Sequence, residues 1–390
     1  MGSNEGWGFQ TMGFAAAPDG SLHIAYTPLG IYFRSRNGTA WVTENLIRFN
    51  TKATMVDPAV PRIDGKDPAS VTGTIRLVAA QDYDHASVTL RVSPMIDAFI
   101  LCAGLGTRLR PLSEHIPKPL VPVVDRPAVK YAVDRLRGLG ARIALNAFHR
   151  AELVCEFAAE EGLIAVREGS LLGTAGGLQN AGAALGEGDI LVWNGDILAD
   201  LDVPALLASH RASRAEATLA VAPRSPGEGT VGLGAEGQIV RLRGERFGEE
   251  LSGGEFLGIH VVGQALREGL PEVGCLVGDV YLPALRRGAR LATHVERAPF
   301  FDIGSPGGYL GAMLHELARR QVSSWIHGSA RVSPGVTVTA SSVGPGAEVS
   351  ASIASSIVWP DTRVTEPLHR AIATPFGILR ACPSELQALP

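Results

Sequence analysis

The sequence predicts an α/β fold built on a Rossmann-like, mostly parallel mixed sheet with helices on both faces. Between residues 95 and 222, apolar runs typical of strands alternate with helix-period segments, which is the pattern of right-handed βαβ units. Residues 1–94 instead hold short alternating stretches separated by turn residues, and an apolar repeat begins after residue 323. The expected domains are therefore a small β-rich segment (1–94), a central α/β domain (95–322) and a short left-handed β-helix (323–390).

The central domain is read from its hydrophobic periodicity. Continuous apolar runs predict strands that are buried on both faces, and segments of helical period bounded by capping residues predict helices. The expected strands are 98–103, 142–146, 164–167, 189–194, 218–222 and 256–262, with hairpin strands 230–233 and 238–243; the expected helices are 128–139, 152–161, 178–184, 203–214 and 309–320. Sheets of this kind bind ligands beyond the carboxyl ends of their strands.

The flanking segments carry weaker signals. Stretches 22–26, 30–34 and 74–78 alternate like strands. In the tail, Ile326, Val332 and Val338 recur every six residues, and later valines repeat that spacing. An imperfect hexad is typical of a parallel β-helix, here of two to three coils; the alternative is an irregular β-tail.

Composition excludes several classes of function. The chain has 390 residues, 46% of them hydrophobic, so it can bury a substantial core. A net charge of -4 and the lack of a like-charged block argue against nucleic-acid binding, so an anionic substrate would need a local basic cluster. The four cysteines show no zinc spacing. Without a long apolar run or a leader pattern, we expect a cytoplasmic protein that does not bind membranes.

The strongest chemical signal follows the first buried strand of the central domain. The segment from Leu101 to Pro111 reads LCAGLGTRLRP, and Pro117-Lys118-Pro119 comes shortly after. Its glycines let the backbone approach a ligand and expose N–H groups to an anion. Arg108, Arg110 and Lys118 add positive charge that can hold a triphosphate.

Two commoner phosphate motifs do not fit this segment. A Walker loop needs Lys-Ser/Thr after its second glycine, and a dinucleotide fingerprint needs a third glycine where Leu109 stands. The one formal GxGxxG, Gly232 to Gly237, lies between hairpin strands and opens no helix, so we interpret it as a turn.

Three further motifs follow in order along the chain. They are Leu172-Gly-Thr-Ala-Gly-Gly177, Val192-Trp-Asn-Gly-Asp196 and Phe301-Asp-Ile-Gly-Ser-Pro306. Together with the glycine segment, they resemble the signature of the sugar-1-phosphate nucleotidyltransferases over roughly residues 95–320, and most of all the mannose-1-phosphate guanylyltransferase branch. Asp196 ends an apolar strand at the edge where the glycine segment lies, and a carboxylate there suits a metal site better than packing.

The resemblance implies a set of site residues and Mg²⁺ as the cofactor. Arg108, Lys118 and Asp196 would be catalytic, and Asp196 with Asp302 would hold the metal. The expected nucleotide-binding residues are Ala103, Gly104, Gly106, Thr107, Gly173, Thr174 and Gly176, and the expected substrate-binding residues are Asn146, Asn194, Glu255 and Gly258. The substrates would be small molecules, an NTP and a sugar 1-phosphate, with GTP and mannose 1-phosphate as the first expectation.

The sequence departs from the family on the sugar side. Many members carry a Glu-Lys-Pro before the strand at Phe256, and its lysine meets the sugar phosphate; here the stretch reads Arg241-Leu-Arg-Gly-Glu-Arg246. Arg243 or Arg246 would have to replace that lysine, or both are solvated loop charges.

Three questions stay open from the sequence. The enzyme could instead be a uridylyltransferase for another sugar 1-phosphate, or the chain could be a silent regulatory protein that binds an NDP-sugar. The segment before Met95 could be a carbohydrate- or protein-binding module, a fusion remnant or an over-extended start, because family members often begin near that position. The apolar tail makes a homo-oligomer a further expectation.

Overall fold

The chain divides into two compact units, Met1–Met95 and Ile96–Pro390. The computed structural model describes residues 96–139 and 141–382 and, before them, the backbone of five strands. In the first unit, β2 (Tyr26–Thr27), β3 (Gly30–Asn37) and β4 (Ala40–Arg48) form an antiparallel meander, and β1 (Leu22–Ile24) pairs antiparallel with β5 (Val88–Leu90). The strand expected at residues 74–78 lies outside the described residues.

The second unit is a mixed α/β domain, as the alternation of strands and helices predicts. Its central sheet runs in the order β10 (Ile164–Arg167), β9 (Ile143–Ala147), β6 (Asp97–Leu101), β11 (Ile190–Asn194), β17 (Ser252–Val262), β14 (Val231–Leu233), β15 (Ile239–Leu242) and β16 (Glu245–Arg246). The first four strands are parallel, and β17 joins them antiparallel. The long β17 also pairs with β13 (Ala217–Arg224), which runs parallel to β18 (Leu291–Val295).

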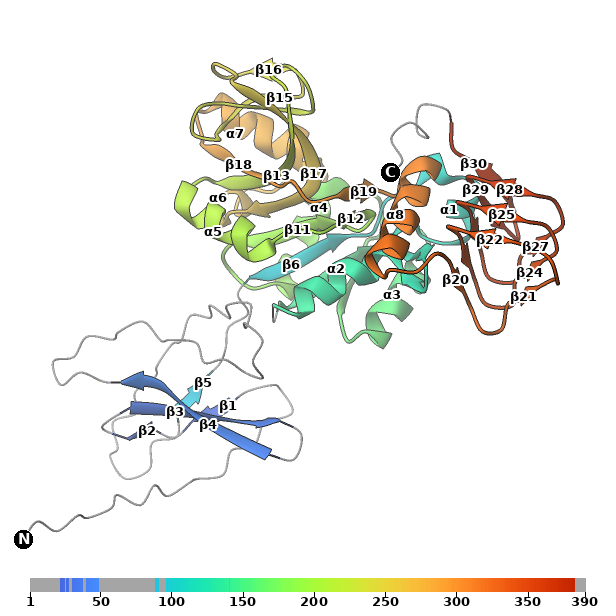
Figure 1. The fold of residues 1–390 in the computed structure, drawn as a ribbon. Helices are drawn as coiled ribbons and strands as arrows, with labels where there is room; N and C mark the ends of the chain where they lie inside the picture. The colour runs from blue at the N-terminus through green and yellow to red at the C-terminus, as the bar shows by residue number, and fades with distance from the viewer. Residues whose placement is uncertain are drawn as a thin grey trace, which may run out of the picture. The chain divides into compact units, whose positions relative to one another are not determined.

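Helices cover both faces of this sheet. Successive side chains of β6 point to opposite faces, yet Ala98, Phe99 and Ile100 are all fully buried, so neither face is open to water. The covering helices are α2 (Ala128–Arg137), α3 (Ala151–Glu160), α4 (Gly173–Asn180), α5 (Val203–Ser213) and α7 (Leu282–Arg286), which surround the strands in Figure 1. Asp202 caps α5, accepting a hydrogen bond from the Ala205 N–H at 3.0 Å, as its position before the helix predicts.

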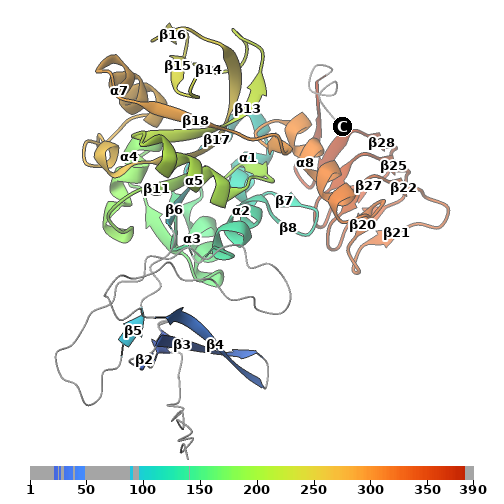
Figure 2. The ribbon, with the colours of Figure 1, turned by 60° about the vertical axis from the view of Figure 1, so that its left-hand side comes forward.

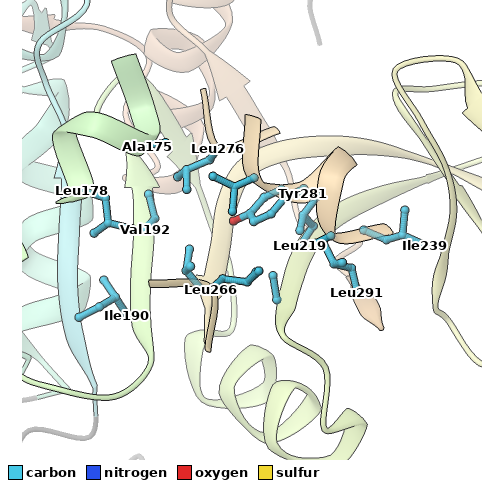
Figure 3. Close-up of a cluster of buried hydrophobic side chains, with 14 of the residues drawn as sticks. Ala175, Leu178, Ile190, Val192, Leu219, Ile239, Leu266, Leu276, Tyr281 and Leu291 are labelled. Carbon is cyan, nitrogen blue, oxygen red and sulfur yellow. The ribbon is translucent and has the colours of Figure 1, made fainter. Parts of the chain in front are cut away.

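The main core lies between the sheet and the segment that follows α6 (Gln264–Arg267). Figure 3 shows Leu178 and Ala175 of α4 facing Val192 and Ile190 of β11, with Tyr281 from η4 (Leu276–Tyr281) close by. These side chains belong to one continuous cluster of buried apolar residues. Because α4 is anchored in this core, its first turn has a fixed position over the sheet edge.

Helix α8 (Pro306–Arg319) joins the domain to the C-terminal tail, and the two lie side by side in both Figure 1 and Figure 2. One apolar cluster contains Leu112 and Ile303 of the central domain together with Trp359 and Ile372 of the tail. The Tyr309 hydroxyl accepts a hydrogen bond from Trp359 Nε1 at 3.0 Å and donates one to the Pro122 carbonyl. The tail is therefore part of the packing that supports the loops of the central domain.

The tail consists of short parallel strands stacked coil on coil in three sheets. The sheets are β20 (Trp325–Ile326), β23 (Ser342–Val343), β26 (Ile357–Val358) and β29 (Ala371–Thr374); β21 (Arg331–Val332), β24 (Glu348–Val349) and β27 (Arg363–Val364); and β22 (Val338–Thr339), β25 (Ile353–Ala354) and β28 (Leu368–His369). The last strand, β30 (Gly377–Arg380), pairs antiparallel with β29.

The spacing of the stacked strands corrects the expected hexad. Trp325 lies beside Ser342, Ser342 beside Ile357, and Ile357 beside Ile372, so one coil takes 17 residues and the next two take 15 each. This is fewer than three hexads would need. Ile326, which begins the expected repeat, is 44% exposed instead of pointing inward.

Candidate active site

A cavity lies at the carboxyl edge of the parallel strands, where the fold predicts a ligand. Its volume is about 190 Å³. The lining comes from the carboxyl ends of β6, β9 and β11, from the segments that follow β6 and β11, from η2 (Lys118–Leu120) and from the start of α4. The lining residues are Leu101, Ala103, Gly104, Gly106, Lys118, Pro119, Asn146, Leu171, Gly173, Thr174, Asn194 and Asp196.

The glycine segment after β6 forms one wall of this cavity. Gly106 adopts a left-handed φ of 63°, which favours glycine, and it precedes the short helix η1 (Thr107–Leu109). A Cβ on Gly106 would lie 3.0 Å from the Cβ of Ser113, so the loop packs closely on the helix α1 (Leu112–His115). The segment thus presents backbone, with little side chain, to the cavity.

The Leu172–Gly177 motif forms the opposite wall, but as the first turn of a helix. Gly173 has a φ of 75°, and α4 begins there, five residues earlier than periodicity predicts. A Cβ on Gly173 would lie 2.4 Å from the Gly274 carbonyl oxygen, and one on Gly176 would lie 2.3 Å from that of Glu272. Gly176 is therefore explained by packing against residues 272–274, and it does not line the cavity.

The two predicted metal carboxylates come together, although 106 positions of sequence separate Asp196 from Asp302. Asp196 immediately precedes β12 (Ile197–Ala199), and Asp302 ends β19 (Phe300–Asp302). These strands pair antiparallel with Ile197 opposite Asp302, and the Ile303 N–H donates to the Asp196 carbonyl at 3.0 Å. This register brings both carboxylates to the same rim.

Two predicted cations complete the cluster. The Lys118 ammonium contacts the Asp196 carboxylate and lies 3.8 Å from Asp302 Oδ1, so one cation touches both acids. Arg108 Nη2 lies 3.2 Å from the other oxygen of Asp302. A Cβ on Gly304 would lie within 2.7 Å of Lys118, Asp302 and Arg108 atoms, so any larger residue there would displace the charged ends of these side chains.

The carboxylate pair fits a hard divalent cation. The ammonium of Lys118 already lies where positive charge bridges Asp196 and Asp302, and Mg²⁺ commonly takes one or two carboxylates together with phosphate oxygens and water. No group of three or more His, Cys, Asp or Glu side chains able to hold a metal occurs among the described residues. Burial, reinforced by the negative charge of Asp196, raises the pKa of Cys102 well above its usual range, so this thiol stays protonated and is a poor ligand.

Of the four predicted substrate-binding residues, only Asn194 and Asn146 line the cavity. Asn194 lines the cavity, and Gly258 packs under it: with a φ of 72°, Gly258 would place a Cβ 2.5 Å from Asn194 Nδ2. Asn146 also lines the cavity, but its amide is engaged with neighbouring protein groups. Glu255, on β17 opposite Ala222, is half-buried and lies outside the lining.

Neither proposed replacement for the missing lysine reaches this cavity. Arg243 donates to Cys275 Sγ at 3.3 Å, and Arg246 is exposed on β16; neither is a lining residue. Arg241 is buried, pairs with Glu250 at 2.8 Å and donates to the carbonyls of Gly229 and Val231, so its charge is used in joining β15 to β14 and the segment before it. That hairpin also contains the formal GxGxxG, which is a turn as interpreted above.

Glu168 was not predicted as a site residue. It follows β10 directly, is 7% exposed and accepts a hydrogen bond from Asn146 Nδ2 at 2.7 Å. The sequence does contain a signal for Glu168, because this polar residue directly follows an expected strand, and the carboxyl ends of parallel strands form the binding edge of the sheet.

Comparisons with known proteins show which family this chain resembles. Residues 97–245 match the sequence model of the family described as Nucleotidyl transferase. This segment contains the glycine loop, Lys118, the α4 motif and Asp196. The match covers less than half of the chain, and together with the relatives below it supports a resemblance to the sugar-1-phosphate nucleotidyltransferases.

Three curated relatives are similar to parts of this chain, and their names differ in nucleotide and sugar. A mannose-1-phosphate guanylyltransferase of Mycobacterium tuberculosis is 35% identical over 130 residues, 32% of this chain and 36% of the relative. A UTP–glucose-1-phosphate uridylyltransferase of Synechocystis sp. is 33% identical over 139 residues, 31% of this chain and 36% of that protein. A putative mannose-1-phosphate guanyltransferase of Sulfolobus acidocaldarius is 28% identical over 248 residues, which are 61% of this chain and 68% of that protein.

These relatives are matched over different extents. The chain spans little more than a third of the length of the Mycobacterium and Synechocystis proteins, and about two thirds of the Sulfolobus protein.

None of the helices in the described part of the chain is long and apolar enough to cross a membrane.

Proposed function

We propose that this chain catalyses Mg²⁺-dependent transfer of a nucleotidyl group from an NTP to a sugar 1-phosphate, releasing pyrophosphate. One observation carries the proposal: Asp196 and Asp302 meet at the Lys118 ammonium on the rim of a glycine-walled cavity. A site of this kind suits a ligand that brings both phosphate charge and a divalent ion.

Each group of site residues has its own role in this reaction. Lys118 and Arg108 neutralise phosphate charge, since both are cations held beside the carboxylates. The glycine segment and the first turn of α4 hold the nucleotide between them. Asp196 and Asp302 would bind Mg²⁺, which neutralises charge on the reacting phosphates when bound. The attacking sugar phosphate is already an anion, so positioning and charge neutralisation suffice without a strong base.

GTP and mannose 1-phosphate are the substrates we propose first. Two of the three relatives described above bear the name of a mannose-1-phosphate guanylyltransferase or guanyltransferase, and one of them matches over 248 residues. The second candidate is uridylyl transfer, which the Synechocystis relative favours. We also propose that the tail is a short left-handed β-helix, and that the enzyme works in the cytoplasm, where NTPs are available.

Pyrophosphate release decides between these candidates. The full chain is assayed with ATP, CTP, GTP and UTP, each with mannose, glucose and N-acetylglucosamine 1-phosphates, with and without Mg²⁺. The proposal expects release only with Mg²⁺ and both substrates, and fastest with GTP and mannose 1-phosphate. Tight binding of an NDP-sugar without turnover of any NTP would instead identify a silent regulatory protein and overturn the proposal.

A further inference from the structure

A series of hydrogen bonds, buried except for its last member, joins the two walls of the cavity. Asn146 Oδ1 accepts the N–H groups of Cys102 at 2.6 Å and Ala103 at 3.2 Å, at the start of the glycine segment. Asn146 Nδ2 donates to Glu168 Oε1 at 2.7 Å, and Glu168 Oε2 accepts the Leu172 N–H at 3.3 Å, at the start of α4. We name this series of hydrogen bonds the loop relay.

The loop relay runs across three neighbouring strands. Asn146 lies on β9, whose parallel neighbours are β6, which leads into the glycine segment, and β10, which leads into Glu168. The Asn146 side chain is 2% exposed, and Glu168 is 7% exposed. Helix α4 seals the relay, since a Cβ on Gly177 would lie 2.8 Å from both Asn146 Nδ2 and Glu168 Oε1. Water therefore cannot easily replace a lost bond.

The chemistry of the loop relay explains why a carboxylate is buried there. Because the Asn146 oxygen accepts two backbone N–H groups, its NH₂ must face Glu168, and it needs an acceptor there. The Leu172 N–H needs a second acceptor. Only a carboxylate offers an acceptor oxygen to each of two donors. In the described part of the chain, no Lys, Arg or His forms an ion pair with Glu168, so charge pairing does not account for it.

The loop relay also determines which amides face the ligand. The N–H groups of Cys102 and Ala103 are used within the protein, so a phosphate is left with donors further along the segment, from Gly104 onward. Those donors keep their direction only if the start of the segment is held.

We propose that Glu168 is a positioning residue for the nucleotide. Through Asn146 it holds the glycine segment, and through Leu172 it holds the first turn of α4, so that both walls bind the nucleotide as one unit. The identity of the ligand as a nucleotide rests on the proposed function; the coupling of the two walls does not.

Reversing the polarity of the loop relay tests this role. In Glu168→Gln, an amide NH₂ faces a donor, and in Asn146→Asp, two carboxylates face each other; each change breaks the relay. In the double variant Asn146→Asp/Glu168→Gln, the new carboxylate accepts the Cys102 and Ala103 amides, and the new amide donates to it while its oxygen accepts from Leu172. The double variant therefore restores every bond with the opposite polarity.

Each variant is compared with the wild type by hydrogen exchange and by nucleotide affinity. Hydrogen exchange of the unliganded protein reports the Cys102 and Ala103 amides, and titration calorimetry gives the Kd for whichever of ATP, CTP, GTP and UTP the wild type binds most tightly. We expect exchange about 10- to 100-fold faster and binding about 10- to 100-fold weaker in each single variant, with both returning near wild type in the double variant. Glu316→Gln is the matched control: this residue is 2% exposed, but its carboxylate accepts hydrogen bonds from Arg319 and Arg320 at the end of α8, so nucleotide affinity should not change.

The outcomes separate the two proposals. Unchanged exchange and affinity in the single variants, or a double variant no better than they are, would overturn the role of Glu168. If the single variants do not fold, the double variant alone decides, because a restored relay must fold and bind like the wild type. A wild type that binds none of the four nucleotides would defeat the proposed function, while exchange would still test the relay.

Discussion

Replacing Lys118 with methionine should almost abolish turnover while leaving the fold intact. The Lys118 side chain is 13% exposed, and its ammonium contacts Asp196 and lies 3.8 Å from Asp302 Oδ1. Lys118→Met keeps much of the apolar stem but removes the charge between the two acids and one cation from the phosphate site. The carboxylates would then repel each other and the incoming triphosphate.

The geometry sets the size of this effect. Two unit charges about 4 Å apart attract by about 4 kcal/mol at an effective dielectric of about 20, which suits a partly buried group. Solvent and Mg²⁺ replace part of that attraction, so we expect a loss of about 3 kcal/mol in transition-state stabilisation. This corresponds to a fall in kcat of about 100-fold, similar to the loss of one oxyanion donor.

The assay is Mg²⁺-dependent pyrophosphate release under saturating substrates, with thermal unfolding to verify the fold. Arg110→Met is the matched control: the sequence suggested Arg110 as a third phosphate cation, but its side chain is 60% exposed, lies outside the cavity lining and pairs with Glu114 at 3.6 Å instead of with Asp196 or Asp302. We expect it to keep activity within about threefold of wild type, the range typical of an exposed ion pair. A Lys118→Met enzyme as active as the Arg110→Met control would refute the reasoning.

Three further substitutions test other parts of the account. Gly304→Ala should lower kcat by about 100-fold without unfolding the protein, because its Cβ would lie 2.5 Å from Lys118 Nζ and shift the cluster; steady-state kinetics measures this. Tyr309→Phe should lower the free energy of unfolding by about 1–3 kcal/mol in urea, because it leaves the buried Trp359 N–H and the Pro122 carbonyl without their partner; an unchanged midpoint would show that tail and domain do not depend on this contact. Burial lowers the pKa of His260 to about 3, below its unfolded value near 6.5, so the unfolded state binds the proton first and stability falls as the pH drops from about 6.5 towards 3. His260→Leu should remove that part of the pH dependence, up to about 1.4 kcal/mol per pH unit, and equal slopes for both proteins would contradict it.

The sequence locates the lining of the cavity well because local rules apply there. Parallel strands place the residues that follow them at one edge, and Gly104, Lys118, Asn146 and Asp196 all line the cavity at that edge, as expected. The start of α4 was not predicted, since glycines argue against a helix by propensity. Tertiary packing against residues 272–274 overrides that propensity.

Longer-range pairing could not be predicted from the pattern. The approach of Asp302 to Asp196 depends on the register of β12 with β19, two three-residue strands whose periodicity is too short to recognise. The resemblance to a family, and not the spacing, suggested that the two acids share a site. The same limit applies to Arg243, whose contact with Cys275 depends on a turn with a positive φ of 48° at that arginine.

The tail shows why a repeat can predict architecture without predicting register. Valines at Val343, Val349, Val358 and Val364 are buried, as stacked coils require. Coils of 15 residues keep these positions inside while shortening the turns between them, so the hexad is lost elsewhere. Ile326 is exposed because it lies in the first coil, which has no described coil before it.

A crystal structure of the full chain grown with Mn²⁺ and a non-hydrolysable GTP analogue would test the central claim most directly. Anomalous scattering locates the metal without ambiguity. We expect one manganese ion at about 2.1 Å from carboxylate oxygens of both Asp196 and Asp302, and in contact with the nucleotide phosphates between the glycine segment and α4. A nucleotide bound elsewhere, or a metal that contacts neither carboxylate, would contradict the account.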